Sequence, residues 1–164
     1  QPKTIMINSI IEIYTFEMFF LTNMNSGTVK KSIIVNDDLE HIWSKISKIT
    51  KLDWLDGQKS TKFLGDKKTG VGAKRLISFV DGSKVEEHIT GWKTKEYFSY
   101  IAVTGLPLNA YHATISLTKI NQLVKITWES YFASDSNKRE FNEFMEFLSN
   151  FYSESLKNFK KQFN

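Results

Sequence analysis

The sequence predicts an α+β fold, in which a curved antiparallel sheet of about seven strands wraps around one long C-terminal helix. The region 137–164 contains no Gly or Pro, and its apolar residues recur every three or four positions, as on one face of a helix. This apolar stripe consists of Phe141, Phe144, Met145, Leu148, Phe151, Tyr152, Leu156, Phe159 and Phe163. So wide an aromatic face must be covered, and the mostly strand-like chain from 29 to 134 is the expected cover. Because a sheet wrapped around a helix can leave a cavity, we expect the function to lie there.

The composition excludes several kinds of site. None of the 164 residues is cysteine, which excludes disulfides, thiolate metal ligands and a cysteine nucleophile, and is compatible with a cytoplasmic protein. The three histidines have no metal-binding spacing, and no phosphate-binding or dinucleotide-binding fingerprint occurs, so we expect neither a metal nor a cofactor. The formal charge of +4 comes from lysines scattered among acidic residues, so nucleic-acid binding is not expected.

The first residues differ from the rest. The stretch 5–21 is strongly apolar, but it contains two glutamates and is shorter than the roughly 20 residues of a membrane-spanning helix, so stable membrane insertion is not expected. The basic start and cleavage site of a signal peptide are not clear in it. Residues 1–27 are therefore expected to be an apolar extension, and residues 28–164 the domain. The extension is interpreted as an amphipathic arm packed on the domain or a partner, or as residues upstream of a native start at Met24, in preference to a weak membrane-surface segment.

The predicted elements follow in a regular order. Residues 29–36 form a first strand rich in β-branched side chains, and 36–38 supply the N-cap and first-turn acids of a short helix that carries Trp43. Residues 51–57 form a turn or a second short helix, which carries Trp54. Six further strands are predicted at 60–64, 73–80, 84–92, 97–104, 109–119 and 124–132. Because the connections are short and the strands consecutive, the sheet is predicted to be antiparallel.

Turn chemistry assigns the strand side chains to faces. Asp81-Gly82 is typical of a two-residue hairpin turn, which places Arg75 opposite His88. One face then carries Arg75, Ile77, Phe79, Glu86, His88 and Thr90. The next hairpin is centred on Leu106-Pro107. It gathers on one side Phe98, Tyr100, Ala102, Tyr111, Ala113 and Ile115. Apolar positions with tyrosine hydroxyls are typical of a pocket wall, and alternation on the last strand points Trp128 into the same space.

Charged groups on such a wall must be compensated. We expect Arg75 and Glu86 to form an ion pair with His88 nearby, because unpaired buried charges are costly. Three uses remain open: Arg75 anchors a carboxylate or hydroxyl of a ligand, the charges only satisfy each other, or the site is catalytic. In the catalytic case Glu86 or His88 would move a proton beside a carbonyl, and Tyr111 would donate to the oxyanion.

The ordered series of features resembles the START-like, or Bet v 1-like (SRPBCC), superfamily with its helix-grip fold. The likeness covers residues 29–163 and is greatest to polyketide cyclase/dehydrase-type members and the related plant abscisic-acid receptors. The residues that carry it are the 29–36 strand, Trp43, Trp54, Gly70-Val71-Gly72-Ala73-Lys74-Arg75, Asp81-Gly82, Glu86, Pro107, Tyr111, the Trp128-Glu129-Ser130-Tyr131-Phe132 strand and the C-terminal helix.

The resemblance implies that the cavity between sheet and helix holds an apolar molecule. Together with the face assignments, it gives a candidate ligand-binding set of Trp54, Arg75, Ile77, Phe79, Glu86, His88, Tyr100, Ala102, Tyr111, Ala113, Trp128, Phe144, Leu148 and Tyr152. The receptor pattern points Glu129 inward where alternation points Trp128 inward, and we follow the alternation. The short hairpin at Asp81-Gly82 departs from the longer gate of the receptors, so hormone-style gating is not expected.

Three functions are weighed on this basis. The leading hypothesis is binding of a small lipophilic molecule, carrying a carboxylate or a hydroxyl, for carriage, storage or sensing. The first alternative is a polyketide cyclase/dehydratase-like enzyme, because one fold hosts many activities. The second is a protein-interaction module of the chaperone-activator type, which would use the exposed sheet or the N-terminal extension.

Overall fold

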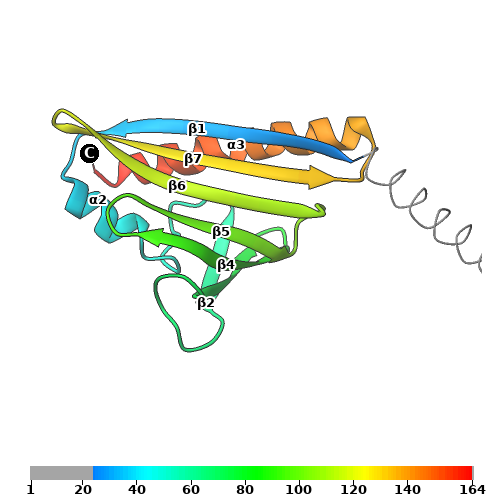
Figure 1. Ribbon diagram of the computed structural model, residues 1–164, viewed down its shortest axis with the longest axis horizontal. Helices are drawn as coiled ribbons and strands as arrows, with labels where there is room; N and C mark the ends of the chain where they lie inside the picture. The colour runs from blue at the N-terminus through cyan, green and yellow to red at the C-terminus, as the bar shows by residue number, and fades with distance from the viewer. Residues whose placement is uncertain (1–23, 164) are drawn as a thin grey trace, which may run out of the picture.

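The computed structural model describes residues 24–163 and confirms the predicted fold class (Figure 1). One sheet holds seven antiparallel strands in the order β1-β7-β6-β5-β4-β3-β2. The strands are β1 (Asn25–Val35), β2 (Gln58–Phe63), β3 (Lys74–Phe79), β4 (Lys84–Lys93), β5 (Tyr97–Thr104), β6 (Ala110–Ile120) and β7 (Leu123–Ser134). The predictions made for residues 1–23 lie outside the described residues, and β1 already begins at Asn25, within the expected extension.

One short helix, α2 (Leu39–Ile46), follows β1, with Asp38 at its N-cap position. Its buried face consists of Ile42, Trp43 and Ile46. The second short helix, the alternative to a turn at 51–57, does not form. Leu55 N donates to Leu52 O at 2.9 Å and Gln58 N to Leu55 O at 3.1 Å, so this segment is a pair of single turns. It nevertheless buries Trp54 in the core.

The long helix α3 (Lys138–Lys161) runs across the sheet alongside β1 and β7 (Figure 1). It begins at Asn137, whose side chain accepts a hydrogen bond from Glu140 N at 3.0 Å and so satisfies one of the free N–H groups of the first turn. Aromatic contacts join α3 to the sheet and the turns. Trp128 of β7 stacks on Tyr152 with ring centroids 3.9 Å apart, and Phe159 packs edge-on to Trp54 at 5.3 Å. These contacts fill the space under the C-terminal half of α3.

The β3–β4 hairpin differs from the prediction by one residue. Phe79 N donates to Ser83 O at 2.9 Å, so the loop has three residues, with Gly82 in the left-handed region at φ +90°. A two-residue type I′ turn would also need a positive φ at Asp81, whereas a three-residue loop needs it only at the glycine. Arg75 therefore pairs with Glu87 instead of His88. Since side chains alternate with period two, this single residue exchanges the faces of β4.

Candidate functional site

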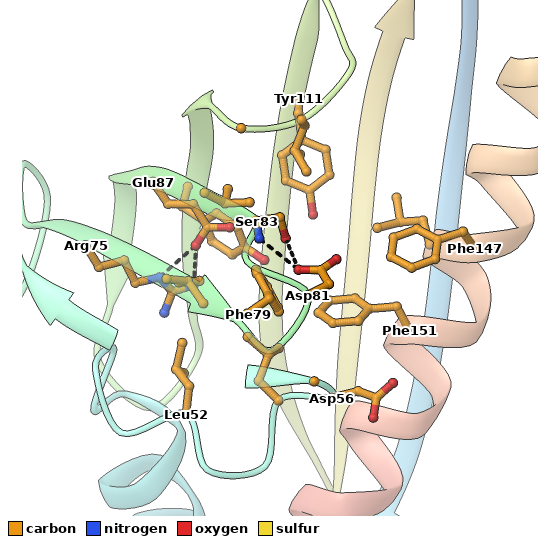
Figure 2. Close-up of a pocket in the computed structure, with 18 of the residues that line it drawn as sticks. Leu52, Asp56, Arg75, Phe79, Asp81, Ser83, Glu87, Tyr111, Phe147 and Phe151 are labelled. Carbon is orange, nitrogen blue, oxygen red and sulfur yellow. Dashed lines mark hydrogen bonds and ion pairs between the residues drawn. The ribbon is translucent and has the colours of Figure 1, made fainter. Parts of the chain in front are cut away.

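A cavity of about 310 Å³ lies between the sheet, α3 and the 52–57 turns (Figure 2). Most of its wall is apolar and aromatic, as in sites that hold small organic molecules. The apolar and aromatic side chains of the wall are Leu52, Trp54, Leu55, Ile77, Phe79, Val80, Val85, Tyr100, Leu106, Pro107, Tyr111, Ile115, Trp128, Phe144, Phe147, Leu148 and Phe151. The polar members are Asp56, Arg75, Asp81, Ser83 and Glu87.

The polar centre of the wall is an ion pair between β3 and β4. Arg75 Nε and Nη2 each lie 2.7 Å from Glu87 Oε2, and Arg75 Nη1 donates to the Ile49 carbonyl oxygen at 2.9 Å. The guanidinium also lies 5.0 Å from the centre of the Tyr100 ring. Burial raises the pKa of the Glu87 carboxyl, and the charge of Arg75 opposes that rise. Figure 2 shows the two side chains reaching toward each other at the cavity wall.

The predicted trio of Arg75, Glu86 and His88 is therefore wrong in two of its members. Glu86 and His88 lie on the outer face of the sheet, where His88 Nε2 and Glu86 Oε1 are 2.7 Å apart and partly exposed. Thr90, predicted to share their face, is exposed. The cause is the extra loop residue at the β3–β4 hairpin, which turns Glu87 inward in place of its neighbours.

A signal for the correct face is present in the sequence. Val85 and Ile89 flank Glu87 at period-two spacing, and both are buried in the structure. The opposite face of the strand reads Glu86, His88, Thr90, all polar. Giving this alternation more weight than the turn type would have placed Glu87 in the cavity.

Buried hydroxyl groups extend the polar part of the wall. Trp128 Nε1 donates to the Tyr100 hydroxyl at 3.0 Å, and the hydroxyls of Tyr111 and Tyr152 are hydrogen-bonded to each other. Burial raises the pKa of all three tyrosines above its ordinary value. At neutral pH these phenols are therefore uncharged and keep their protons for donation.

Most of the predicted site residues meet at the cavity. Those that line it are Trp54, Arg75, Ile77, Phe79, Tyr100, Tyr111, Trp128, Phe144 and Leu148. Ala113 and Tyr152 are fully buried beside the wall, and Ala102 contributes instead to a small pocket beside the 105–111 segment. Alternation on β7 is confirmed, because Trp128 is buried whereas Glu129 pairs with Lys30 on the surface at 3.0 Å. The role of the predicted site residues in ligand binding stays a prediction.

The cavity opens to solvent at a rim of exposed lining residues. Val80 in the β3–β4 loop is 73% exposed and Phe147 on α3 is 59% exposed. Asp56 and Asp81, also exposed, lie at this rim, and Asp81 Oδ1 accepts hydrogen bonds from the N and Oγ of Ser83. Sequence reasoning missed the rim, because the loops that form it lie far apart along the chain and only the fold brings them together.

Two features are absent from the side chains and helices of residues 24–163. Residues 24–163 contain no group of three or more His, Asp or Glu side chains that could hold a metal ion. No helix within this range has the length and apolar character needed to cross a membrane.

Comparisons with known proteins agree with this geometry. Residues 26–164 match the model of a family described as "Polyketide cyclase / dehydrase and lipid transport", which confirms the resemblance predicted from the sequence. A comparison with curated proteins finds no match.

Several solved structures share the fold. The protein XoxI from Bacillus cereus has a TM-score of 0.72 at 22% identity, with 84% of this chain and 95% of that chain covered. A protein from Nitrosospira multiformis has a TM-score of 0.72 at 21% identity, covering 84% and 97%. Norcoclaurine synthase from Thalictrum flavum, in complex with dopamine and hydroxybenzaldehyde, has a TM-score of 0.67 at 17% identity, covering 86% and 88%. At these identities the likeness concerns the fold alone.

Proposed function

Because the chain belongs to the polyketide cyclase/dehydrase and lipid transport family, we propose that it binds a small lipophilic molecule in the cavity between the sheet and α3, as a carrier, store or sensor. The observation that carries this proposal is the cavity itself. Its volume of about 310 Å³ falls within the roughly 300–1,000 Å³ range of small-molecule sites, and its wall is mostly apolar with a few converging polar groups. The absence of cysteine is compatible with a role in the cytoplasm.

Binding is favoured over the two alternatives. Of the three candidate catalytic groups, Glu86 and His88 lie on the outer face, so neither can reach a molecule in the cavity. Tyr111 lines the cavity and keeps its proton, as an oxyanion donor must, but its hydroxyl is bonded to Tyr152 and neither predicted proton-transfer group lies beside it. An interaction module would not need an open cavity, and here the protein's own aromatic residues leave that space unfilled.

The solved complex of norcoclaurine synthase adds support of a general kind. That protein holds dopamine and hydroxybenzaldehyde, both small aromatic molecules, on a fold that this chain shares. The cavity of this chain, which Trp54, Phe79 and Trp128 help to line, is large enough and aromatic enough for molecules of that size.

Filling the cavity tests the proposal. N-Phenyl-1-naphthylamine is an uncharged dye whose fluorescence increases in apolar surroundings, and we expect it to bind the native protein. Leu148 lines the cavity from α3 and is buried, so Leu148→Trp places a larger side chain in the open space. The variant should bind the dye at least about tenfold more weakly.

A matched control separates cavity filling from a general effect of tryptophan. Glu143 lies on the exposed face of the same helix, so Glu143→Trp adds the same side chain away from the cavity and should leave dye binding unchanged. Thermal unfolding of both variants shows whether they stay folded. If the native protein does not bind the dye, or if the two variants bind equally, the proposed function is wrong. If the dye binds and only Leu148→Trp weakens it, native mass spectrometry of protein purified from its own host identifies the natural ligand.

A further inference from the structure

The buried end of the cavity carries no net charge. Arg75 and Glu87 are both less than one tenth exposed, and their charges cancel across two contacts of 2.7 Å. The remaining charged residues of the wall are Asp56 and Asp81, both acidic and both at the exposed rim. A buried anion therefore meets no uncompensated cation along the wall, and would lose its hydration without gaining a partner.

The guanidinium of Arg75 is also largely occupied. Its Nε donates to Glu87 Oε2, which Nη2 also contacts in the ion pair, its Nη1 donates to the Ile49 carbonyl, and one face lies over the Tyr100 ring. A bidentate contact with a ligand carboxylate needs two parallel N–H groups; the Nε–Nη2 edge of Arg75 is turned to Glu87, and on the Nη1–Nη2 edge Nη1 already donates to Ile49. The expectation that Arg75 anchors a ligand carboxylate is not supported by this geometry.

A cationic ligand group would be no better stabilised in the cavity than an anionic one. Glu87 is the carboxylate at the buried end, and both of its contacts to Arg75 use the same oxygen, Oε2. Oε1 can accept a hydrogen bond from a ligand, but the full charge of the group is already compensated. A ligand ammonium would stand beside the Arg75 guanidinium, with like charges repelling in a site of low dielectric constant.

The groups that remain are suited to an uncharged oxygen. Tyr100 accepts from Trp128, and its own O–H lies near the Tyr111 hydroxyl at the cavity wall, where it can donate to a ligand oxygen. Burial raises the pKa of Tyr100, which keeps that proton in place at neutral pH. A ligand hydroxyl or carbonyl can accept from Tyr100, and a hydroxyl or amide can also donate to Glu87 Oε1.

From these contacts we infer that the ligand is an uncharged, compact, largely aromatic molecule with one hydroxyl, carbonyl or amide group, and that the Arg75–Glu87 pair excludes charged analogues. This inference rests on the proposed function and specifies its substrate class. The volume of about 310 Å³ lies near the lower limit of the roughly 300–1,000 Å³ range, so a molecule of one or two rings fits better than a two-chain lipid.

Three planar naphthalenes of equal size test the inference. 2-Naphthamide is neutral, 2-naphthoate is an anion at neutral pH and 2-naphthamidine is a cation, while their skeletons are the same. Each is titrated against the protein with bound N-phenyl-1-naphthylamine, and displacement of the dye gives the affinity. We expect the amide to bind at least about tenfold more tightly than either ion.

Neighbouring glutamates provide a matched pair of variants. Glu87→Gln leaves Arg75 uncompensated at the cavity wall, so the affinity for 2-naphthoate should increase at least about tenfold relative to the amide. Glu86→Gln makes the same chemical change one residue away on the outer face and should leave the order of affinities as in the native protein. The double variant Arg75→Met/Glu87→Met removes both charges without leaving either unpaired, and 2-naphthoate should remain a weak ligand.

The outcomes separate this inference from the proposed function. If a charged naphthalene binds the native protein as tightly as the amide, the inference is overturned while cavity binding stands. If Glu86→Gln shifts the order as much as Glu87→Gln does, the assignment of the pair is overturned. If the dye does not bind at all, both proposals fail. Should Glu87→Gln not fold, the order in the native protein and in the double variant still decides the question.

Discussion

The neighbouring residues Glu86 and Glu87 of β4 each contact a basic side chain at the same distance but in opposite surroundings. His88 Nε2 and Glu86 Oε1 lie 2.7 Å apart on the outer face of the sheet, with side chains 25% and 30% exposed. Arg75 Nη2 and Glu87 Oε2 also lie 2.7 Å apart, but on the cavity wall and only 4% and 8% exposed. The distance therefore does not determine what each pair contributes. The contribution of each pair depends on the face of the strand that it occupies, because water screens the outer pair and is excluded from the inner one.

The largest expected difference between the two pairs is in stability. Arg75→Met leaves Glu87 buried without its cation and should lower the free energy of unfolding by about 3–5 kcal/mol. Urea denaturation measures this change. The double variant Arg75→Met/Glu87→Met should recover most of the loss, because it removes the stranded charge as well. A loss below about 1 kcal/mol for the single variant would mean that water reaches the inner pair.

The same comparison shows what the sequence can and cannot predict. The 3.6-residue period of the region 137–164 and the alternation around Trp128 predicted α3 and the inward face of β7, because burial of an apolar side imposes these periods directly. The antiparallel pairing of the consecutive strands from β2 to β7 followed from their short connections. These features depend on local patterns that extend over many residues.

The inner ion pair could not be obtained with the same certainty. Its register depends on one residue in the β3–β4 loop, and Asp81-Gly82 fits both a two-residue and a three-residue turn. The rim residues Val80 and Phe147 come from segments far apart along the chain, so only the folded structure brings them to one opening. A local ambiguity of one residue is thus enough to exchange the charged groups of the site.

The dependence of stability on alkaline pH should show whether the tyrosines of the cavity wall are shielded from water. Burial raises the pKa of Tyr100, Tyr111 and Tyr152, so above about pH 10 the unfolded chain releases protons that the folded chain keeps. Stability should therefore fall as the pH rises above 10, by about 1.4 kcal/mol per pH unit for each of these phenols. Urea denaturation between pH 9 and pH 11 measures the slope.

Single tyrosine variants show which groups cause this slope. Tyr100→Phe and Tyr111→Phe each remove one buried phenol, so each should reduce the slope by the contribution of one group, whatever its effect on stability at neutral pH. An unchanged slope in both variants would mean that water reaches the tyrosines of the cavity wall. It would also contradict the exclusion of charged ligands.

The loop that fixes the register gives a smaller expected effect. Gly82 has a φ of +90°, so Gly82→Ala places a β-carbon in the left-handed region and should cost about 1–2 kcal/mol. Gly82→Asn should cost less, because asparagine adopts this region more readily. Both values come from thermal or urea unfolding. Equal tolerance of alanine and asparagine would indicate that the loop does not need a left-handed residue, which would contradict the three-residue turn.

The smallest expected effect belongs to the outer pair, and it is the most direct test of the register. Glu86→Gln or His88→Gln removes one partner of a contact that solvent already reaches, so the free energy of unfolding should change by only about 0–1 kcal/mol. Neither variant should alter displacement of N-phenyl-1-naphthylamine by 2-naphthamide, because both side chains lie behind the sheet from the cavity. If either variant changes that displacement, Glu86 and His88 face the ligand. The hairpin would then have the two-residue turn, and Glu87 would lie on the surface.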